Sequence, residues 1–176
     1  MQKTQKMLLA IAIFISMGFL FFTFFIDGCT EQREARTPVA YHDTLVVQQK
    51  RLVDHTEKLH AAIETYVQDD MDFEFEALQK QVKASELMMS NTTPYENDTV
   101  LRKGLKILLL SYQNLIENEY KQVIDLMKKP DREFNDFEQK KVDSLNRVID
   151  SKSEKSYEDF ANRVKVFRSK YNIIAK

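Results

Sequence analysis

Residues 105–127 read LKILLLSYQNLIENEYKQVIDLM, and this stretch carries the clearest structural signal in the chain. Its apolar and tyrosine side chains recur at spacings of three and four residues, the period of one face of an α-helix. The stripe consists of Leu105, Leu108, Leu109, Tyr112, Leu115, Ile116, Tyr120, Val123 and Met127. Lys128 and Lys129 then precede Pro130, which places positive charge at a helix end before a stop.

Three further segments carry stripes with the same alternation of spacings, and prolines fall between the segments. The pattern therefore predicts helices over residues 41–68, 71–90, 95–129 and 133–173. Short connections make successive helices antiparallel neighbours. We expect an all-α fold, an antiparallel up-down-up-down four-helix bundle, preceded by an N-terminal signal or anchor helix.

Two of the predicted boundaries carry different local signals. Thr93-Pro94-Tyr95-Glu96 has the form of a capping box with proline at the first helical position. The stretch QDDMDFEFE, residues 68–76, separates the first two helices and contains neither glycine nor proline. Asp69, Asp70 or Asp72 can cap the second helix there. Without such a cap the first two helices would fuse into one long rod.

Glycine is scarce outside the first 28 residues. Gly18 and Gly28 lie in that leader, which leaves Gly104 as the one glycine of the remaining chain. Phosphate-binding loops, dinucleotide fingerprints and nucleophile elbows need several glycines at fixed spacing, because the backbone turns tightly or approaches the ligand closely. The sequence excludes these sites and disfavours a fold with many tight turns.

The first 28 residues have the organisation of an export signal. Lys3 and Lys6 form a short basic region, and residues 7–26 contain no charge. An apolar run of this length serves as a secretory signal, and it is also long enough to cross the membrane as an uncleaved anchor. Either interpretation exports the rest of the chain.

The sequence immediately after the apolar run separates these two interpretations. Ile26-Asp27-Gly28-Cys29 resembles the lipobox of bacterial lipoproteins, whose cysteine is acylated and becomes the N-terminus; Asp27 departs from the pattern, which puts efficient cleavage in doubt. Cys29 is the one cysteine of the chain, so no internal disulfide can form and acylation gives the thiol a role. We predict a lipoprotein signal peptide or uncleaved anchor at 1–28, a tether at 29–40 and a helical domain at 41–176.

The charge balance of the exported part is close to neutral. Removing residues 1–28 leaves 24 bases and 26 acids, because Lys3, Lys6 and Asp27 are lost. Such a balance gives no electrostatic reason to bind nucleic acid. The expected partners are membrane lipid, through the acylated Cys29, and a protein of the cell envelope.

Two patterns of metal-ligand type are incomplete. Glu57 and His60 have the Glu-x-x-His spacing of di-iron bundles, but a second copy is missing. An alternation of acids resembles a calcium loop, but it lacks the glycine at the sixth position and the glutamate at the twelfth. These acids are Asp70, Asp72, Glu74 and Glu76. We therefore predict no metal, no cofactor and no catalytic residue.

Four tyrosines map to the inward stripes of the predicted helices. They are Tyr66, Tyr112, Tyr120 and Tyr171. Buried tyrosines direct their hydroxyls to a partner or to the edge of the core. We interpret them as packing residues; the alternative is that they line a small-molecule pocket between helices.

Three stretches of the chain carry a resemblance to a known family. They are Tyr41-His42-Asp43, ENEYKQVIDLMKK at 117–129 and FANRVKVFRSKYN at 160–172. With these stretches the chain resembles an uncharacterised family of small all-helical bacterial surface lipoproteins. The resemblance implies an exported lipoprotein with a helical bundle, and it implies no known reaction and no catalytic residues. We expect a membrane-anchored, extracytoplasmic protein of the bacterial envelope, at the outer membrane or cell surface, which is a non-catalytic interaction or structural module. The alternatives are a small-molecule-binding sensory bundle and a metal-dependent enzyme.

Overall fold

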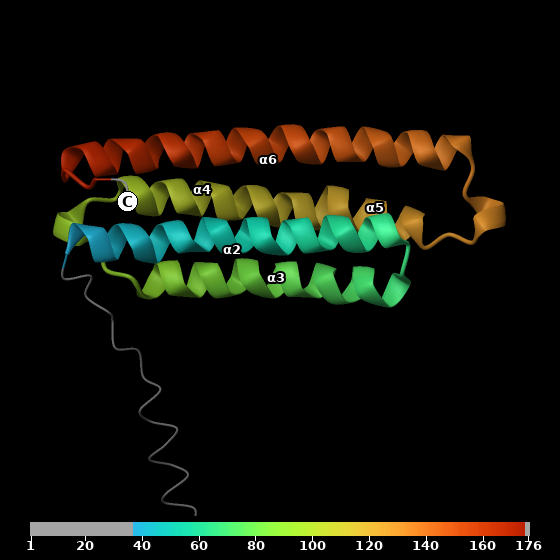
Figure 1. The fold of residues 1–176 in the computed structure, drawn as a ribbon, viewed down its shortest axis with the longest axis horizontal. Helices are drawn as coiled ribbons and strands as arrows, with labels where there is room; N and C mark the ends of the chain where they lie inside the picture. The colour runs from blue at the N-terminus through green and yellow to red at the C-terminus, as the bar shows by residue number, and fades with distance from the viewer. Residues whose placement is uncertain (1–36, 175–176) are drawn as a thin grey trace, which may run out of the picture. The chain divides into compact units, whose positions relative to one another are not determined.

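The computed structural model describes residues 37–174, and all the secondary-structure elements in this range are helices (Figure 1). The all-α prediction is confirmed, with four long helical rods. The rods are α2 (Pro38–Thr65), α3 (Gln68–Asn91), the continuous run of α4 (Val100–Leu115), the π-helical η2 (Ile116–Tyr120) and α5 (Lys121–Met127), and α6 (Asp136–Lys170). The 3-10 turns η1 (Tyr95–Asn97) and η3 (Asp131–Glu133) lie in the connections. The predicted signal or anchor helix and Cys29 lie outside the described residues.

Helix α2 begins three residues earlier than predicted. The Thr37 hydroxyl accepts a hydrogen bond from the Ala40 N–H at 3.1 Å, and Pro38 occupies the first helical position. Proline is favoured there because its missing N–H would have no partner in the helix. Residues 38–40, predicted to be tether, are therefore the first turn of α2.

The first two helices are separate, so the alternative of one fused rod is wrong. Helix α2 ends because Tyr66 adopts a left-handed conformation, with φ of 59°. Helix α3 follows Val67, which provides no side-chain cap. Asp69 and Asp70 instead occupy the first turn of α3, where the helix dipole favours negative charge.

The third rod begins at Val100 and not at residue 95, so the predicted capping box at residues 93–96 is wrong. Glu96 and Asn97 have φ of 47° and 61°, which interrupts the helix before it can form. The Asp98 carboxylate accepts a hydrogen bond from the Val100 N–H at 2.9 Å. This bond satisfies one of the amides that a helix start leaves without a partner.

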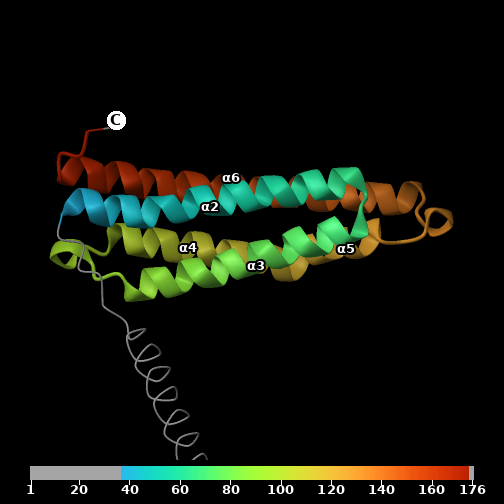
Figure 2. The same ribbon diagram turned by 60° about the horizontal axis from the view of Figure 1, so that its bottom comes forward.

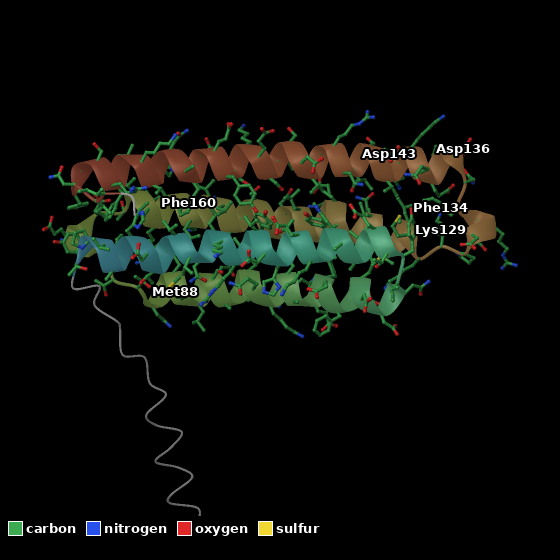
Figure 3. The ribbon with its side chains drawn as sticks, in the orientation of Figure 1. Met88, Lys129, Phe134, Asp136, Asp143 and Phe160 are labelled. Carbon is green, nitrogen blue, oxygen red and sulfur yellow. The ribbon has the colours of Figure 1, made fainter. Side chains whose placement is uncertain are left out.

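Helix α6 begins at a capping box. The Asn135 side chain accepts the Phe137 N–H at 2.8 Å, and Glu138 accepts the Asn135 N–H at 3.4 Å. Glu138 also accepts a hydrogen bond from Lys129 at 3.0 Å, which joins the end of α5 to the start of α6 (Figure 3). The helix dipole of α6 is stabilised at both ends. Its first turn carries acids, and its last turn carries Arg168 and Lys170.

Successive rods run in opposite directions in the two ribbon views (Figures 1 and 2). Contacts between distant residues agree with this path. The Tyr41 hydroxyl, near the start of α2, donates to the Asp98 carbonyl before α4 at 3.4 Å, and Lys170 at the end of α6 pairs with the same residue. At the opposite end, Lys128 after α5 pairs with Asp72 near the start of α3.

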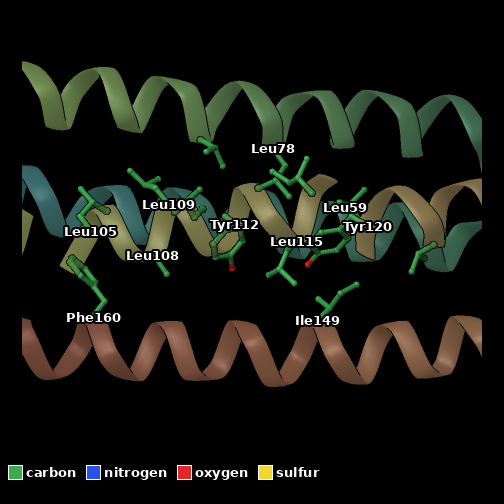
Figure 4. Packing of buried hydrophobic residues seen from close by; sticks show 14 of the residues in the cluster. Leu59, Leu78, Leu105, Leu108, Leu109, Tyr112, Leu115, Tyr120, Ile149 and Phe160 are labelled. Carbon is green, nitrogen blue, oxygen red and sulfur yellow. The ribbon is translucent and has the colours of Figure 1, made fainter. Parts of the chain in front are cut away.

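The core lies between the four rods, and Figure 4 shows part of it from close by. It is built by the predicted stripes, and its largest fully buried side chains come from every rod. They are Tyr41, Tyr112, Tyr120, Phe160, Phe167, Leu45, Leu52, Leu59, Met71, Leu78, Leu101 and Leu105. At Gly104 the third rod comes close to α6, because a Cβ there would lie 3.1 Å from the Phe160 ring. This close approach accounts for the one glycine outside the leader.

Helix α6 contacts the core through a narrow seam. Of its 35 residues, five are buried: Val142, Ile149, Ser156, Phe160 and Phe167. Spacings of seven residues separate most of them, as along the seam of a coiled coil.

In residues 37–174, none of the helices combines the length and the apolar content that a membrane span needs.

Candidate functional site

The residues of the two incomplete metal-ligand patterns do not converge in the structure. Glu57 is exposed on α2, while His60 points inward and hydrogen-bonds with the Tyr120 hydroxyl at 3.0 Å. Asp72 pairs with Lys128, and Glu76 pairs with Lys80 at 3.0 Å. Among residues 37–174 no three His, Cys, Asp or Glu side chains form a group that could hold a metal ion. Cys29, the predicted lipidation site, lies outside the described residues.

The predictions for the four tyrosines differ in outcome. Tyr112 and Tyr120 are fully buried, as predicted. Tyr66 is 62% exposed, so its prediction is wrong, because α2 ends before it and its left-handed backbone turns the side chain outward. Tyr171 is half-buried and packs against Phe167, with the ring centroids 4.6 Å apart.

The buried tyrosines belong to a polar cluster between α2, the third rod and α6. The Tyr112 hydroxyl hydrogen-bonds with the Tyr157 hydroxyl of α6, and Tyr120 bonds with His60 of α2. Burial raises the pKa of both Tyr120 and Tyr157 above the ordinary range of a phenol. These phenols therefore stay protonated near neutral pH, and the cluster joins three helices by hydrogen bonds.

The π-helical turn η2 places a carboxylate beside this cluster. Glu119 lies in that turn and is 9% exposed. Its Oε1 accepts a hydrogen bond from Lys152 of α6 at 2.7 Å, and Lys152 also donates to Asn114 at 3.1 Å. The second oxygen, Oε2, is buried and has no hydrogen-bond partner in residues 37–174. Short π-helical turns often occur at functional positions, but here the carboxylate is held by an internal ion pair.

A hollow lies between α3 and α4. It is at the end of the helical body, residues 37–174, where α2 begins. Its volume is about 580 Å³, which lies in the range of small-molecule sites. The residues that line it come from the last turns of α3, the connection and the first turns of α4. They are Glu86, Met89, Ser90, Pro94, Thr99, Arg102, Lys103, Lys106, Leu109 and Leu110. We name this hollow the α3–α4 groove.

The α3–α4 groove combines an apolar floor with a basic wall. Leu109 is buried, and the half-exposed Leu110 continues the apolar surface outward. Arg102, Lys103 and Lys106 supply the basic wall, and Glu86 is the one acid among the lining residues. Gln113 donates a hydrogen bond to Glu86 at 2.7 Å. The groove therefore suits a ligand that carries both negative charge and apolar surface.

Two smaller hollows have a different character. One, of about 170 Å³, lies further along the same two helices and is lined by residues that include Lys83 and Glu117. The other, of about 190 Å³, lies between α2 and α6 beside His60 and includes Glu64 and Asp150. Their small volumes and mixed or acidic linings leave the α3–α4 groove as the strongest candidate for a binding site.

The sequence interpretation missed the groove, although part of its signal is visible. Residues 99–116 contain Arg102, Lys103 and Lys106 and no acid, in a chain whose overall charge is close to neutral. This local excess of positive charge belongs to no catalytic or metal-binding motif, so no site was predicted there.

The chain matches no protein-family model, no curated protein and no solved structure. The resemblance to small helical surface lipoproteins therefore stays a prediction.

Proposed function

We propose that this protein is an extracytoplasmic lipoprotein of the bacterial cell envelope, anchored through an acylated Cys29. We also propose that its rods form an antiparallel up-down-up-down four-helix bundle. The bundle serves as a non-catalytic interaction or structural module, held at the outer membrane or cell surface.

The observation that carries this proposal is the lipobox-like sequence at residues 26–29, directly after a basic and then an apolar segment. Helix α2 begins soon afterwards, since Thr37 caps it eight residues after Cys29. A tethered module is expected to have this order, with a signal first, then a short connection and then a helical body. Asp27 is the departure from the pattern, and it makes the uncleaved anchor the competing form of the same proposal.

Intact mass spectrometry of the protein extracted from membranes tests the anchor. The expected product begins at Cys29 and carries two or three acyl chains. Cys29→Ser is expected to abolish this product and to leave a full-length precursor. An unmodified thiol on a full-length chain in the membrane would contradict lipidation and support the uncleaved anchor.

Asp27→Ser provides a matched variant for the processing step. It replaces the charged residue of the lipobox-like sequence by a small one and leaves Cys29 in place. We expect a larger mature fraction than in the natural protein. A mature fraction that falls in Asp27→Ser would show that residues 26–29 do not act as a lipobox.

A small-molecule-binding role is the second candidate, because the volume of the α3–α4 groove suits such a ligand. Thermal-shift measurements across a panel of small anionic and amphipathic molecules distinguish the two roles. A ligand that stabilises the natural protein but not Lys103→Glu/Lys106→Glu would favour this second role.

A further inference from the structure

The α3–α4 groove lies at the end of the body that any anchor at Cys29 would hold near the membrane. Thr37 caps α2, and Tyr41 one turn later contacts Asp98, which directly precedes the groove residue Thr99. The eight residue-to-residue steps from Cys29 to Thr37 span at most about 28 Å. Helix α2 has 28 residues, which makes it about 42 Å long. The connection is therefore shorter than the body that it holds.

The charges of the groove match an anionic membrane surface. Arg102, Lys103 and Lys106 lie on the first two turns of α4, and Lys103 and Lys106 are exposed. Lysine and arginine near a membrane are attracted to anionic headgroups, and this attraction falls off within a Debye length of about 8 Å. A short anchor keeps these side chains at a high effective concentration near the surface, so weak individual contacts are sufficient.

The remaining lining residues suit the rest of a phospholipid. The exposed Thr99 hydroxyl can donate a hydrogen bond to a phosphate oxygen. Pro94 and the half-exposed Leu110 supply the apolar surface on which a glycerol and the first methylenes of an acyl chain can pack. The Glu86 carboxylate repels an anion. It lies on the α3 side of the groove, where it accepts a hydrogen bond from Gln113.

We propose that the α3–α4 groove binds the headgroup of an anionic phospholipid in the anchoring membrane, which holds this face of the body against the lipid surface. The proposal rests on the proposed anchoring at Cys29. It leaves the faces of α2 and α6 that point away from the groove available to an envelope partner.

Lysine labelling of the protein, extracted from membranes in its natural form and placed in lipid nanodiscs, tests the contact. The two preparations contain phosphatidylcholine alone or phosphatidylcholine with phosphatidylglycerol. We expect an amine-reactive label to modify Lys103 and Lys106 about threefold more slowly in the anionic discs. Lys140 and Lys141, exposed on α6 at the opposite end of the body, are expected to react equally in both. Raising the salt concentration should remove the difference, because the attraction is screened.

A pair of charge-reversal variants checks that the effect belongs to the groove. Amide hydrogen exchange over residues 86–110 is compared between the two lipids for Lys103→Glu/Lys106→Glu and for Lys140→Glu/Lys141→Glu. The natural protein and the second variant should gain protection in anionic discs, and the first variant should not. Exchange across the rest of the body reports whether each variant is folded.

The outcomes separate this proposal from the proposed anchor. Flotation of the nanodiscs with their protein shows whether the chain is anchored at all, and a chain that does not float overturns the proposed function. An anchored protein with equal labelling in both lipids overturns the headgroup proposal and leaves the anchor intact. Protection of Lys103 and Lys106 in native membranes but not in anionic discs also overturns it, because it would assign the groove to a protein partner.

Discussion

The Lys170 ammonium lies 2.7 Å from Asp98 Oδ2, so an ion pair joins the end of α6 to the connection that precedes α4. The Asp98 side chain is 3% exposed, and its other oxygen accepts the Val100 N–H. One carboxylate therefore caps a helix and holds the end of another. The first prediction follows from this double role.

Asp98→Asn is expected to destabilise the protein by about 1–3 kcal/mol at neutral pH, because a charged acceptor becomes a neutral one in a buried position. Burial alone would raise the pKa of Asp98, but hydrogen bonds from Lys170 and Val100 lower it on balance. A carboxyl group with a lowered pKa stabilises the folded state above its unfolded pKa, and this contribution disappears as the pH falls through the folded pKa.

Chemical denaturation of both proteins at a series of pH values checks this prediction. The difference in the free energy of unfolding should be largest near pH 6–7, should shrink as the pH falls below the unfolded pKa of about 3.9, and should vanish below the lower pKa of the folded state. Asp143→Asn, which changes an exposed carboxylate of α6, is the control and should change stability by less than about 0.5 kcal/mol. A pH-independent difference would show that the charge of Asp98 is not the cause.

Three buried tyrosines should keep their phenol protons until the protein unfolds at high pH. Burial raises the pKa of Tyr41 to about 12 and raises the pKa of Tyr120 and Tyr157 as well. The unfolded chain releases these protons near pH 10, so the folded state holds more protons above that pH and stability falls as the pH rises. Phenolate absorbance should show these three phenols ionising together with alkaline unfolding. Their ionisation near pH 10 in a protein that is still folded would contradict their burial.

Removing one partner of the Lys152–Glu119 ion pair should destabilise the protein more than removing both partners. Lys152→Met leaves the buried Glu119 carboxylate without its cation, and we expect a loss of about 2 kcal/mol or more. The double variant Lys152→Met/Glu119→Leu removes both charges and should recover most of that loss. Denaturant unfolding measures both. A double variant less stable than Lys152→Met would show that Glu119 has a further stabilising role.

Gly104 should tolerate a methyl group better than a larger side chain. A Cβ at this position would lie 2.5 Å from Arg163 Cδ and 3.1 Å from the Phe160 ring. The arginine side chain can move, and alanine gains about 1 kcal/mol of helix propensity, so Gly104→Ala should lie within about 1 kcal/mol of the natural protein. Gly104→Leu also pushes against the buried Phe160 and should lose about 2 kcal/mol or more. Equal stability of the two variants would show that the rods do not approach closely here.

The helical period predicted the rods well because burial repeats along each of them. Leu105, Leu108 and Tyr112 lie on the predicted stripe and are fully buried. The start of the third rod was missed for a local reason. Glu96 and Asn97 adopt left-handed backbone conformations, which are set by the contacts of the connection and leave no mark in the hydrophobic period.

The candidate groove could be predicted only in part. The excess of positive charge over residues 99–116 is visible in the sequence. The hollow beside it depends on how closely α3 approaches α4, and a pattern of apolar positions does not encode that separation. The inward turn of Glu119 was likewise missed, because its partner Lys152 lies on another rod, 33 residues away.

Helix α6 presents most of its surface to water and meets the core along one narrow line of side chains. The ion pairs Lys129–Glu138 and Lys170–Asp98 hold the two ends of this helix to the connections beside it. A pulling force applied to the C-terminus would load the Lys170–Asp98 pair before the rest of α6, so this pair is expected to set the force at which mechanical unfolding begins.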